Sequence, residues 1–202
     1  MKPLSRGCKE MLDRALAAVL LVTLAPLFAA IALAIRVSSR GPTLHRRRVL
    51  GLDGGEFDAL KFRTMVAEAD AILEREPDLL QAFHHNMKLR DDPRTTTLGR
   101  WLRQTSLDEL PQLYNVLRGE MSLVGPRMIA PQERPLYGDT IGKRLSVKPG
   151  ITGLWQVSGR QELSYSERVR LDLEYVERWS LWLDVVIIAR TIPAVLSMRG
   201  AH

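Results

Sequence analysis

Residues 15–35 read ALAAVLLVTLAPLFAAIALAI, a stretch without a single charged side chain. In helical form it is long enough to cross the hydrocarbon core of a bilayer, which is about 30 Å thick. Pro26 stands near its middle, where a proline removes a backbone hydrogen bond and its ring clashes with the preceding turn. The stretch therefore predicts a membrane helix that is bent at Pro26.

Basic residues flank the apolar stretch on both sides. Lys2, Arg6, Lys9 and Arg14 precede it, and Arg36, Arg40, Arg46, Arg47 and Arg48 follow it. Because basic flanks remain on the cytoplasmic side of a membrane, both ends are expected there. A straight span would place one basic cluster on the wrong side, whereas a helix broken at Pro26 would enter one leaflet and return to anionic headgroups. We therefore predict a re-entrant hairpin over residues 1–37. A straight span and a cleaved signal peptide are the alternatives, and the length of the stretch argues against the peptide.

Composition narrows the class of partner. The chain has 202 residues, of which 46% are hydrophobic, enough for one sizeable core. Its net charge of +6 and pI of about 9.8 favour nucleic acid, anionic lipid or phosphorylated substrates as partners. Aromatic residues make up only 6% and show no paired stacking motif, which argues against nucleic acid. Cys8 is the only cysteine, so an intrachain disulfide framework is excluded and a reducing cytoplasm fits.

The chain beyond the apolar stretch is expected to be mainly helical. Helical periodicity predicts helices within 66–89, in two pieces separated near Pro77, and at 98–103, 107–118 and 165–178. Turn signals between Ser38 and Gly55 predict a short hairpin that leads into residues 57–62. Segments 125–127 and 148–153 are expected to be structured loops. The fold class predicted is α+β, with a small β element and amphipathic helices at the membrane interface.

The tryptophans near the end of the chain bear on that interface. Trp179, Trp182 and the apolar run 183–188 suit the headgroup level of a bilayer, and they suit a protein core equally well.

Asp108 and Glu109 form an adjacent acidic pair within SLDELP at 106–111. One interpretation is a capping box, in which Ser106 bonds the Glu109 amide and Glu109 reaches back to Ser106. Pro111 argues against that reading, because it would disturb a regular helix start. The other interpretation is catalytic: one carboxylate attacks a phosphorus atom while the other holds a metal ion.

Attack by a carboxylate on a phosphate needs positive charge nearby. Arginine grips phosphate oxygens with two parallel hydrogen bonds, and Mg²⁺ prefers oxygen ligands from carboxylates and diphosphates. We therefore expect Mg²⁺ at Asp108 and Glu109. The candidates for binding phosphate are Lys61, Arg94, Arg100, Arg103, Arg127, Lys148 and Arg160.

Further motifs follow in a fixed order along the chain. They are GP at 41–42, KFRTM at 61–65, DPRTT at 92–96, SLDELPQLYNVLRGEMSLVGPR at 106–127, KPGITGLWQVSGR at 148–160 and WSLWLD at 179–184. Together they resemble the monotopic phosphoglycosyl transferases of the bacterial sugar transferase family over nearly the whole chain. The resemblance implies transfer of a sugar 1-phosphate from a UDP-sugar to polyprenyl (undecaprenyl) phosphate, with release of UMP. This reaction initiates assembly of a surface glycan or exopolysaccharide.

The resemblance also implies roles for single residues. Asp108 would form a covalent intermediate with the sugar phosphate, which the lipid phosphate then attacks, and Glu109 would serve Mg²⁺. Catalytic positions that match the family are Lys61, Arg103 and Asp184, and substrate-binding positions are Arg127 and Arg160. Asp184 equally suits a structural partner of an arginine.

The chain departs from the family pattern at three positions. Ala25 stands where a serine often precedes the proline of the membrane break, Met128 replaces the proline that commonly ends GPRP, and Arg47 replaces a frequent glutamine. Rigidity of the loop at Arg127 is therefore less assured.

These observations predict a hairpin over residues 1–37 and a membrane-associated catalytic domain over residues 38–202, at the cytoplasmic face of the bacterial inner membrane. The expected partners are a UDP-sugar, polyprenyl phosphate and anionic lipids, and a homodimer stays open. Residues 153–172 resemble the larger family members, which favours UDP-galactose or UDP-glucose over a UDP-N-acetylhexosamine. A non-catalytic basic membrane scaffold and a magnesium-dependent phosphohydrolase are the alternatives from other classes.

Overall fold

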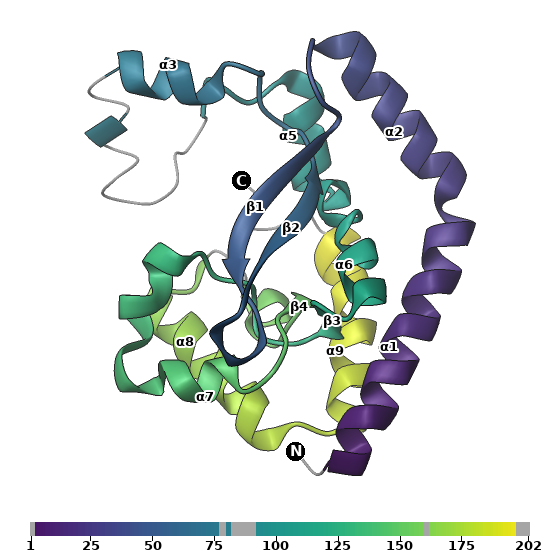
Figure 1. Ribbon diagram of the computed structural model, residues 1–202, viewed down its shortest axis with the longest axis vertical. Helices are drawn as coiled ribbons and strands as arrows, with labels where there is room; N and C mark the ends of the chain where they lie inside the picture. The colour runs from purple at the N-terminus through teal and green to yellow at the C-terminus, as the bar shows by residue number, and fades with distance from the viewer. Residues whose placement is uncertain (1–2, 77–79, 82–91, 160–161, 197–202) are drawn as a thin grey trace.

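A computed structural model describes residues 3–76, 80–81, 92–159 and 162–196, and Figure 1 shows their arrangement. The first half holds α1 (Pro3–Thr23), α2 (Ala25–Ser38), β1 (Leu44–Leu50), β2 (Glu56–Phe62), α3 (Ala69–Arg75) and α5 (Thr97–Gln104). The second half holds α6 (Gln112–Arg118), β3 (Ser122–Val124), α7 (Ile141–Leu145), β4 (Gly150–Thr152), α8 (Tyr165–Arg178) and α9 (Leu181–Leu196). Short 3₁₀ segments are Leu52–Gly54, Leu107–Glu109, Pro131–Thr140 and Trp155–Val157. The prediction of a mainly helical fold with a small β element is confirmed.

The apolar stretch forms α1 and α2, which meet at a bend of 62°. Leu24 at the junction leaves the helical conformation (φ −88°, ψ 2°), and Pro26 is the second residue of α2, where its missing N–H costs least. No single described helix is long and apolar enough to cross a bilayer, but the bent pair passes that test of length and composition when taken together. The bend at Pro26 was predicted; its angle is well short of a full reversal.

Both helices of the bent pair lie along one side of the molecule (Figure 1). Ala17 of α1 belongs to the main core, together with Val49 of β1, Val116 of α6 and Ile187 of α9. Ile31 and Ile35 of α2 pack with Phe62 and Leu102 in a second core cluster. A third cluster joins Leu50, Ile129, Tyr137 and Leu145. Each limb of the pair is therefore attached to the same folded unit.

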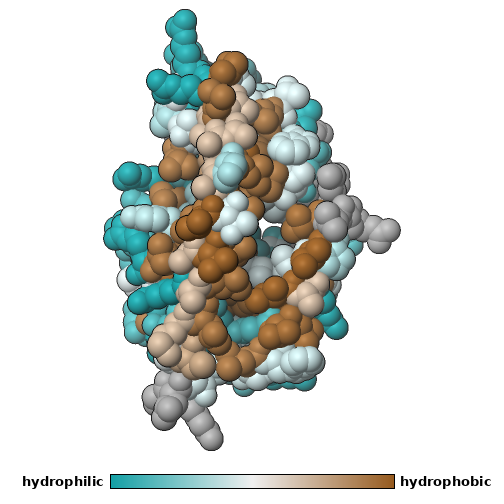
Figure 2. Space-filling model, turned by 90° about the vertical axis from the view of Figure 1, so that its right-hand side faces the viewer, coloured by the Kyte–Doolittle hydropathy of each residue, from teal (hydrophilic) through white to brown (hydrophobic). Residues whose placement is uncertain are grey.

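The outer face of these helices is apolar and exposed. Exposed large side chains on α1 and α2 are Met11, Leu12, Leu16, Val19, Val22, Leu27, Leu33 and Val37. Trp182 of α9 is 74% exposed, whereas Trp179 packs beside the main core. Figure 2 shows the hydrophobic side chains gathered in a band along this side of the molecule. The two tryptophans thus differ: Trp179 is partly buried against the core, and Trp182 is a surface residue.

Two small sheets hold the centre. Strands β1 and β2 form the predicted hairpin, with Leu44 opposite Phe62 and Leu50 opposite Glu56 in an antiparallel register. Strand β3 pairs with β4 in parallel, Ser122 opposite Gly150 and Val124 opposite Thr152. The parallel pair was not predicted, because residues 148–153 were expected to form a loop. It matters for the site, since an isolated bridge places Arg127 against Gly150 directly after β3.

Helix boundaries agree with the periodicity where no proline intervenes. Helix α8 has the predicted bounds, and α5 exceeds its prediction by one residue at each end. The predicted helix 107–118 is divided at Pro111 into a 3₁₀ turn and α6. Helix α3 falls in the first predicted piece of 66–89, but Pro77 lies outside the described residues.

Candidate active site

Four chain segments bring charged side chains together around the turn that precedes α6 in the chain. Lys61 extends from β2, Arg103 from the last turn of α5, and Arg127 from the segment after β3. Asp108 and Glu109 lie in the 3₁₀ turn that precedes Pro111. These are five of the predicted site residues, and the fold assembles them around the acidic pair.

The turn that carries the pair begins at Ser106, which adopts the left-handed conformation with φ +56°. Few non-glycine residues occupy this region, and it redirects the chain between α5 and the acidic pair. The capping-box interpretation, against which Pro111 argued, does not hold, because Ser106 gives no side-chain cap to this turn. The Glu109 carboxylate is directed to Lys61 and Arg127 instead of back to Ser106.

Glu109 is held by two cations. Its Oε1 accepts hydrogen bonds from Lys61 Nζ at 2.6 Å and from Arg127 Nη2 at 3.2 Å. Burial alone would raise the pKa of Glu109, but Lys61 and Arg127 outweigh burial and lower that pKa to about 2. Glu109 is therefore a fixed anion at neutral pH.

Asp108 is in the opposite situation. Only 8% of the residue is exposed, and among the residues that the structure describes no ion pair or hydrogen bond is recorded for its carboxylate. Burial raises the pKa of Asp108 to about 6; Glu109 adds to this rise, and Lys61, Arg103 and Arg127 oppose it. A buried carboxylate that is not engaged by hydrogen bonds is available as a nucleophile or a metal ligand.

Arg103 is oriented by hydroxyl groups and not by a carboxylate. Its Nε donates to Thr64 Oγ1 at 2.9 Å and its Nη1 to Thr95 Oγ1 at 3.2 Å, while Asp108 acts on it electrostatically. The side chain of Arg94 does not bond to the acidic pair; it makes two hydrogen bonds to Asp92, at 2.8 and 2.7 Å. Arg94 thus supports the surroundings of Arg103 and does not contact the acidic pair.

The backbone of Arg127 is fixed from two sides. Its N–H donates to Asp172 Oδ1 at 3.3 Å, and its carbonyl accepts from Arg144 Nη2 at 2.6 Å. Asp172 also accepts from the Tyr137 hydroxyl at 2.8 Å, and Arg144 is fully buried. Burial raises the pKa of Asp172 to about 6, which Arg144 partly counteracts. These contacts supply the loop rigidity that the absence of proline at Met128 had put in doubt.

Sequence reasoning missed several residues around Arg127. The Arg127 guanidinium lies 5.8 Å from the centroid of the Trp155 ring, and the Arg168 guanidinium lies 5.1 Å from it. Arg47 donates to Glu133 at 3.1 Å. Burial and the charge of Arg127 lower the pKa of Arg47, and Glu133 and Glu109 oppose this change. The sequence singled out Arg47 as a basic residue after the apolar stretch and as a departure from the family, and not as a site residue. For Asp172, the one available signal is an acidic residue on the apolar face of a predicted helix.

Two predicted residues lie in a different network. Asp184 accepts from Lys9 at 2.6 Å, from the Tyr175 hydroxyl at 2.8 Å and from the Trp179 indole at 3.1 Å. Lys148 pairs with Glu10 of α1 at 3.0 Å, and Arg6 approaches the same carboxylate at 3.5 Å.

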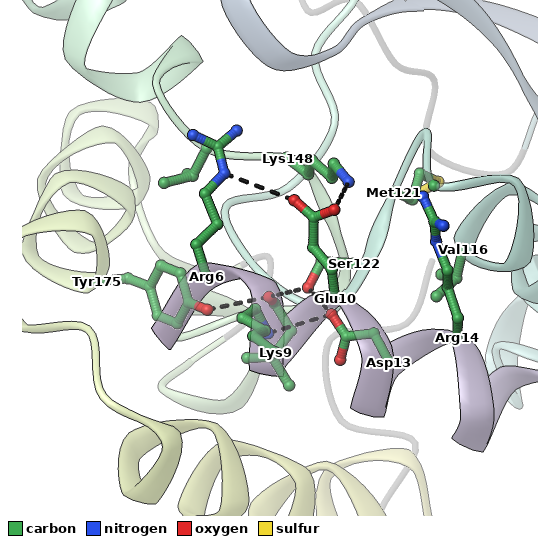
Figure 3. A pocket seen from close by; sticks show the side chains of 13 residues that line it. Arg6, Lys9, Glu10, Asp13, Arg14, Val116, Met121, Ser122, Lys148 and Tyr175 are labelled. Atoms are coloured by element: carbon green, nitrogen blue, oxygen red, sulfur yellow. Dashed lines mark hydrogen bonds and ion pairs between the residues drawn. The ribbon is translucent and has the colours of Figure 1, made fainter. Parts of the chain in front are cut away.

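Arg6, Glu10 and Lys148 line a small cavity of about 30 Å³ beside α1, where Glu10 lies between Arg6 and Lys148 (Figure 3). Neither Asp184 nor Lys148 contacts the acidic pair. Both residues attach α1 to the rest of the chain, and the partner of Asp184 is a lysine and not an arginine.

The remaining predicted residues are Arg160 and Arg100. Arg160 lies outside the described residues. Arg100 lies on α5, whose last turn carries Arg103.

A divalent ion such as Mg²⁺ needs several oxygen ligands. No group of three or more histidine, cysteine or acidic residues suited to a metal occurs in the described part of the chain. The protein therefore offers the two carboxylates of Asp108 and Glu109. Two carboxylates fit Mg²⁺, which usually retains water and completes its octahedron with phosphate oxygens of the substrate.

Comparison with known proteins identifies the family of the chain. The model of the family described as "Bacterial sugar transferase" matches residues 4–198. The chain is 43% identical, over its whole length and 91% of the relative, to the exopolysaccharide production protein ExoY of Rhizobium meliloti. It is 42% identical to the UDP-glucose:undecaprenyl-phosphate glucose-1-phosphate transferase of Caulobacter vibrioides, covering 96% of this chain and 72% of that one.

A third relative is the undecaprenyl-phosphate galactose phosphotransferase of Salmonella typhimurium, 45% identical over 80% of this chain and 35% of that longer protein. The predicted resemblance and the prediction of a transferase enzyme are confirmed. The chain belongs to the bacterial sugar transferase family.

Proposed function

We propose that the chain transfers a sugar 1-phosphate from a UDP-sugar to undecaprenyl phosphate, giving undecaprenyl diphosphate sugar and UMP. The observation that carries this proposal is the unequal acidic pair. Asp108 is buried and not hydrogen bonded within the described chain, whereas Glu109, one residue later, is fixed between Lys61 and Arg127. A helix cap would not need this arrangement, because a cap requires the carboxylate to face the helix start.

The proposed reaction has two steps. In the first, a carboxylate oxygen of Asp108 attacks the sugar-bearing phosphorus, the bond from that phosphorus to the UMP oxygen breaks, and UMP leaves with the electron pair. In the second, an oxygen of the lipid phosphate attacks the same phosphorus, and the Asp108 carboxylate is released. Lys61, Arg103 and Arg127 surround this position and would neutralise charge on the transferred phosphoryl group.

Asp108 and Glu109 would hold Mg²⁺ together with oxygens of the donor diphosphate. When bound, the ion would neutralise diphosphate charge and orient it for in-line attack. Because Lys61 and Arg127 already engage Glu109, the Glu109 carboxylate stays ionised and ready for the ion down to low pH.

The donor is proposed to be UDP-galactose or UDP-glucose. The relatives from Salmonella typhimurium and Caulobacter vibrioides are named for galactose and glucose respectively, in support of this choice. The product would be the first lipid-linked unit of an exopolysaccharide, in keeping with the name of the relative from Rhizobium meliloti.

The proposed location is the cytoplasmic face of the inner membrane, with α1 and α2 entering one leaflet. Support comes from the apolar exposed face of both helices and from the contacts that attach each limb to the same folded unit. Trp182 and the apolar side chains around it on α9 would extend the contact with lipid. This placement confines the enzyme to the plane of its lipid substrate, which raises their effective concentration.

The test of transfer uses the full chain in nanodiscs with undecaprenyl phosphate, Mg²⁺ and a panel of UDP-sugars. We expect UMP and a lipid-linked diphosphate sugar to form in equal amounts with UDP-galactose or UDP-glucose, and EDTA to abolish both. Release of inorganic phosphate without a lipid product would favour the phosphohydrolase instead. UMP formation from none of the sugars tested would favour the scaffold.

A further inference from the structure

Arg127 borders a second group of charged side chains besides the acidic pair. Arg47 of β1 and Arg168 of α8 both lie within electrostatic range of Arg127. Glu133 connects them: its Oε1 accepts from Arg47 at 3.1 Å, and its Oε2 accepts at 3.3 Å from the hydroxyl of Tyr165, three residues before Arg168. The proposed reaction assigns no task to Arg47 or Arg168.

The buried ring of Trp155 packs against two of these arginines, Arg127 and Arg168. Its side chain is 7% exposed, and the guanidinium groups of Arg127 and Arg168 lie 5.8 and 5.1 Å from the centroid of its ring. Arg168 is fixed further by a hydrogen bond from its Nε to the carbonyl of Leu163 at 3.0 Å. Guanidinium groups placed in this way lose little conformational freedom on binding an anion, and each offers paired donors to phosphate oxygens.

The charges around Arg127 do not balance. Among the described residues the cations are Lys61, Arg103, Arg127, Arg47 and Arg168, and the carboxylates are Asp108, Glu109 and Glu133. These five cations and three carboxylates give the named side chains a net charge of +2. The pairs Arg94 with Asp92 and Arg144 with Asp172 each add one charge of each sign and do not change the excess. Repulsion among the cations costs free energy, which an anionic ligand would recover.

We propose that Arg47 and Arg168, together with Arg127, bind the phosphate of the leaving nucleotide. This inference rests on the proposed function, and it extends the site from the transferred phosphoryl group to UMP. The side chains fall into two sets that meet at Arg127: Lys61 and Arg103 near Asp108, and Arg47 and Arg168 near Glu133. Two sets of cations suit the two phosphates of a nucleoside diphosphate sugar.

The chemistry of the first step gives the second set a purpose. As the bond between the two phosphates breaks, the leaving oxygen keeps the electron pair, and UMP gains negative charge that the diphosphate did not carry there. Fixed guanidinium groups at that position stabilise the developing charge, and they do so without reorganising during the reaction. Glu133 orients Arg47 and is itself held by the backbone N–H of Ala130 at 2.8 Å.

The competing explanation is structural: Arg47 only attaches β1 to the segment of Glu133, and Arg168 only packs on Trp155. Substitutions with glutamine separate the two explanations, because the chain provides a matched control for each. Arg48 follows Arg47 on β1 but is exposed and pairs with Glu56 and Asp58. Arg170 lies two residues after Arg168 on α8 and pairs with Glu174 at the surface.

The experiment measures Kd for UMP and for uridine with the full-length chain in nanodiscs, and checks thermal unfolding of every variant. We expect Arg47→Gln and Arg168→Gln each to weaken UMP binding by about ten-fold or more and to leave uridine binding within two-fold. Arg48→Gln and Arg170→Gln should bind both ligands as the unmodified chain does. Arg47→Lys, which keeps the charge, should recover most of the affinity for UMP.

UMP binding by Arg47→Gln and Arg168→Gln at unmodified affinity would overturn the inference, and so would an equal loss of UMP and uridine binding. The transfer assay keeps this result separate from the proposed function. If the unmodified chain transfers sugar phosphate while both variants bind UMP normally, only the phosphate site is wrong. If the unmodified chain transfers nothing, the proposed function fails first.

Discussion

At the scale of single residues, Asp108 and Glu109 have opposite electrostatic environments although they are neighbours in sequence. Glu109 is stabilised as an anion by Lys61 and Arg127, and its pKa falls to about 2. Asp108 is buried without a hydrogen-bonded partner in the described chain, and its pKa rises to about 6. Neighbouring acids whose pKa values are moved apart can perform different tasks in one reaction.

This contrast predicts opposite effects on stability. Ionised Glu109 stabilises the fold above its ordinary pKa, and this stabilisation is lost as pH falls toward 2. Ionised Asp108 is a cost at neutral pH, because its folded pKa is raised. Glu109→Gln should therefore lower the free energy of unfolding at pH 7 by about 1–3 kcal/mol, and Asp108→Asn should leave it unchanged or raise it by up to about 2 kcal/mol. Denaturant unfolding in detergent measures both, and equal destabilisation by the two variants would contradict this account.

The pKa of Asp108 also predicts the pH dependence of the first step. Attack needs the ionised carboxylate, and the ionised fraction decreases as pH falls through about 6. The rate of UMP release in a single turnover without lipid should fall about ten-fold for each pH unit below that value. Rapid quenching between pH 5 and pH 8 measures the rate, and a rate that stays constant down to pH 5 would exclude Asp108 as the titrating group in this step.

The sequence predicted which residues form this site, but it did not predict the backbone conformation that positions them. Lys61, Arg103, Asp108, Glu109 and Arg127 were predicted together, and the fold brings them together. The capping box failed because Ser106 takes a left-handed conformation, which residue type alone does not indicate. The catalytic and binding roles of these residues stay predictions until the measurements above are made.

At the scale of secondary-structure elements, the parallel pair β3 and β4 determines where Arg127 lies. A Cβ atom added at Gly150 would come within 2.1 Å of the backbone nitrogen of Gly125 and 2.5 Å of the Thr152 oxygen. Glycine is needed there because two backbone segments approach closely. The pairing escaped prediction because each strand has only three residues and the partner is far away in sequence, so that no local pattern signals it.

Gly150→Ala should therefore separate the two strands and displace Arg127. We expect a loss of about 3 kcal/mol in stability and a loss of most transfer activity. Gly142→Ala is the matched control: Gly142 lies in α7 with nothing within 4 Å of an added Cβ, so the change should raise stability by about 0.5–1 kcal/mol. Unfolding curves of the two variants decide this, and an undisturbed Gly150→Ala protein would contradict the described packing.

Asp184 is the element-scale case in which the resemblance and the structure point to different roles. The structure places it between α9 and α1, where Lys9 and the Tyr175 hydroxyl contact its carboxylate. Such long-range partners are not visible in a sequence, because Lys9 is 175 positions away. The family motif located an important residue and did not reveal what it contacts.

Asp184→Asn should consequently destabilise the protein more than it slows chemistry. Loss of one member of a buried ion pair typically costs about 3–5 kcal/mol, and asparagine retains part of the hydrogen bonding. The single-turnover rate of UMP release, corrected for the folded fraction, should change less than five-fold. Asp139→Asn, at an exposed position, serves as the control for both measurements. A stable Asp184→Asn protein whose rate falls a hundred-fold would instead assign Asp184 to catalysis.

At the scale of the whole molecule, the bent helix pair and α9 expose large apolar side chains. Hydrophobic side chains gather along one side of the molecule (Figure 2). The sequence predicted the apolar stretch and its bend from Pro26 alone. It did not predict that α1 and α2 lie along the domain, since their buried side chains face core residues from distant segments. The division into a hairpin over 1–37 and a catalytic domain over 38–202 stays a prediction.

Membrane topology can be read from a natural probe. Cys8 is the only cysteine, and it is exposed near the start of α1. If the pair is re-entrant, Cys8 should react with an impermeant maleimide in inside-out vesicles and resist it in intact cells. A Cys8→Ser variant that carries Ser39→Cys, after the end of α2, should behave in the same way. Reaction of the two positions from opposite sides would show a full crossing and reject the re-entrant arrangement.

The central claim is that Asp108 carries the sugar phosphate during transfer, and mass spectrometry of the protein, before and after digestion, tests it most directly. The protein is mixed with UDP-galactose or UDP-glucose and Mg²⁺ in the absence of lipid, then quenched in acid and digested. We predict one equivalent of UMP, a mass increase of one hexose phosphate on the peptide that contains Asp108, loss of the adduct on addition of undecaprenyl phosphate, and no adduct with Asp108→Asn. Efficient transfer by the Asp108→Asn variant, or UMP release that requires lipid and leaves the protein mass unchanged, would contradict the account.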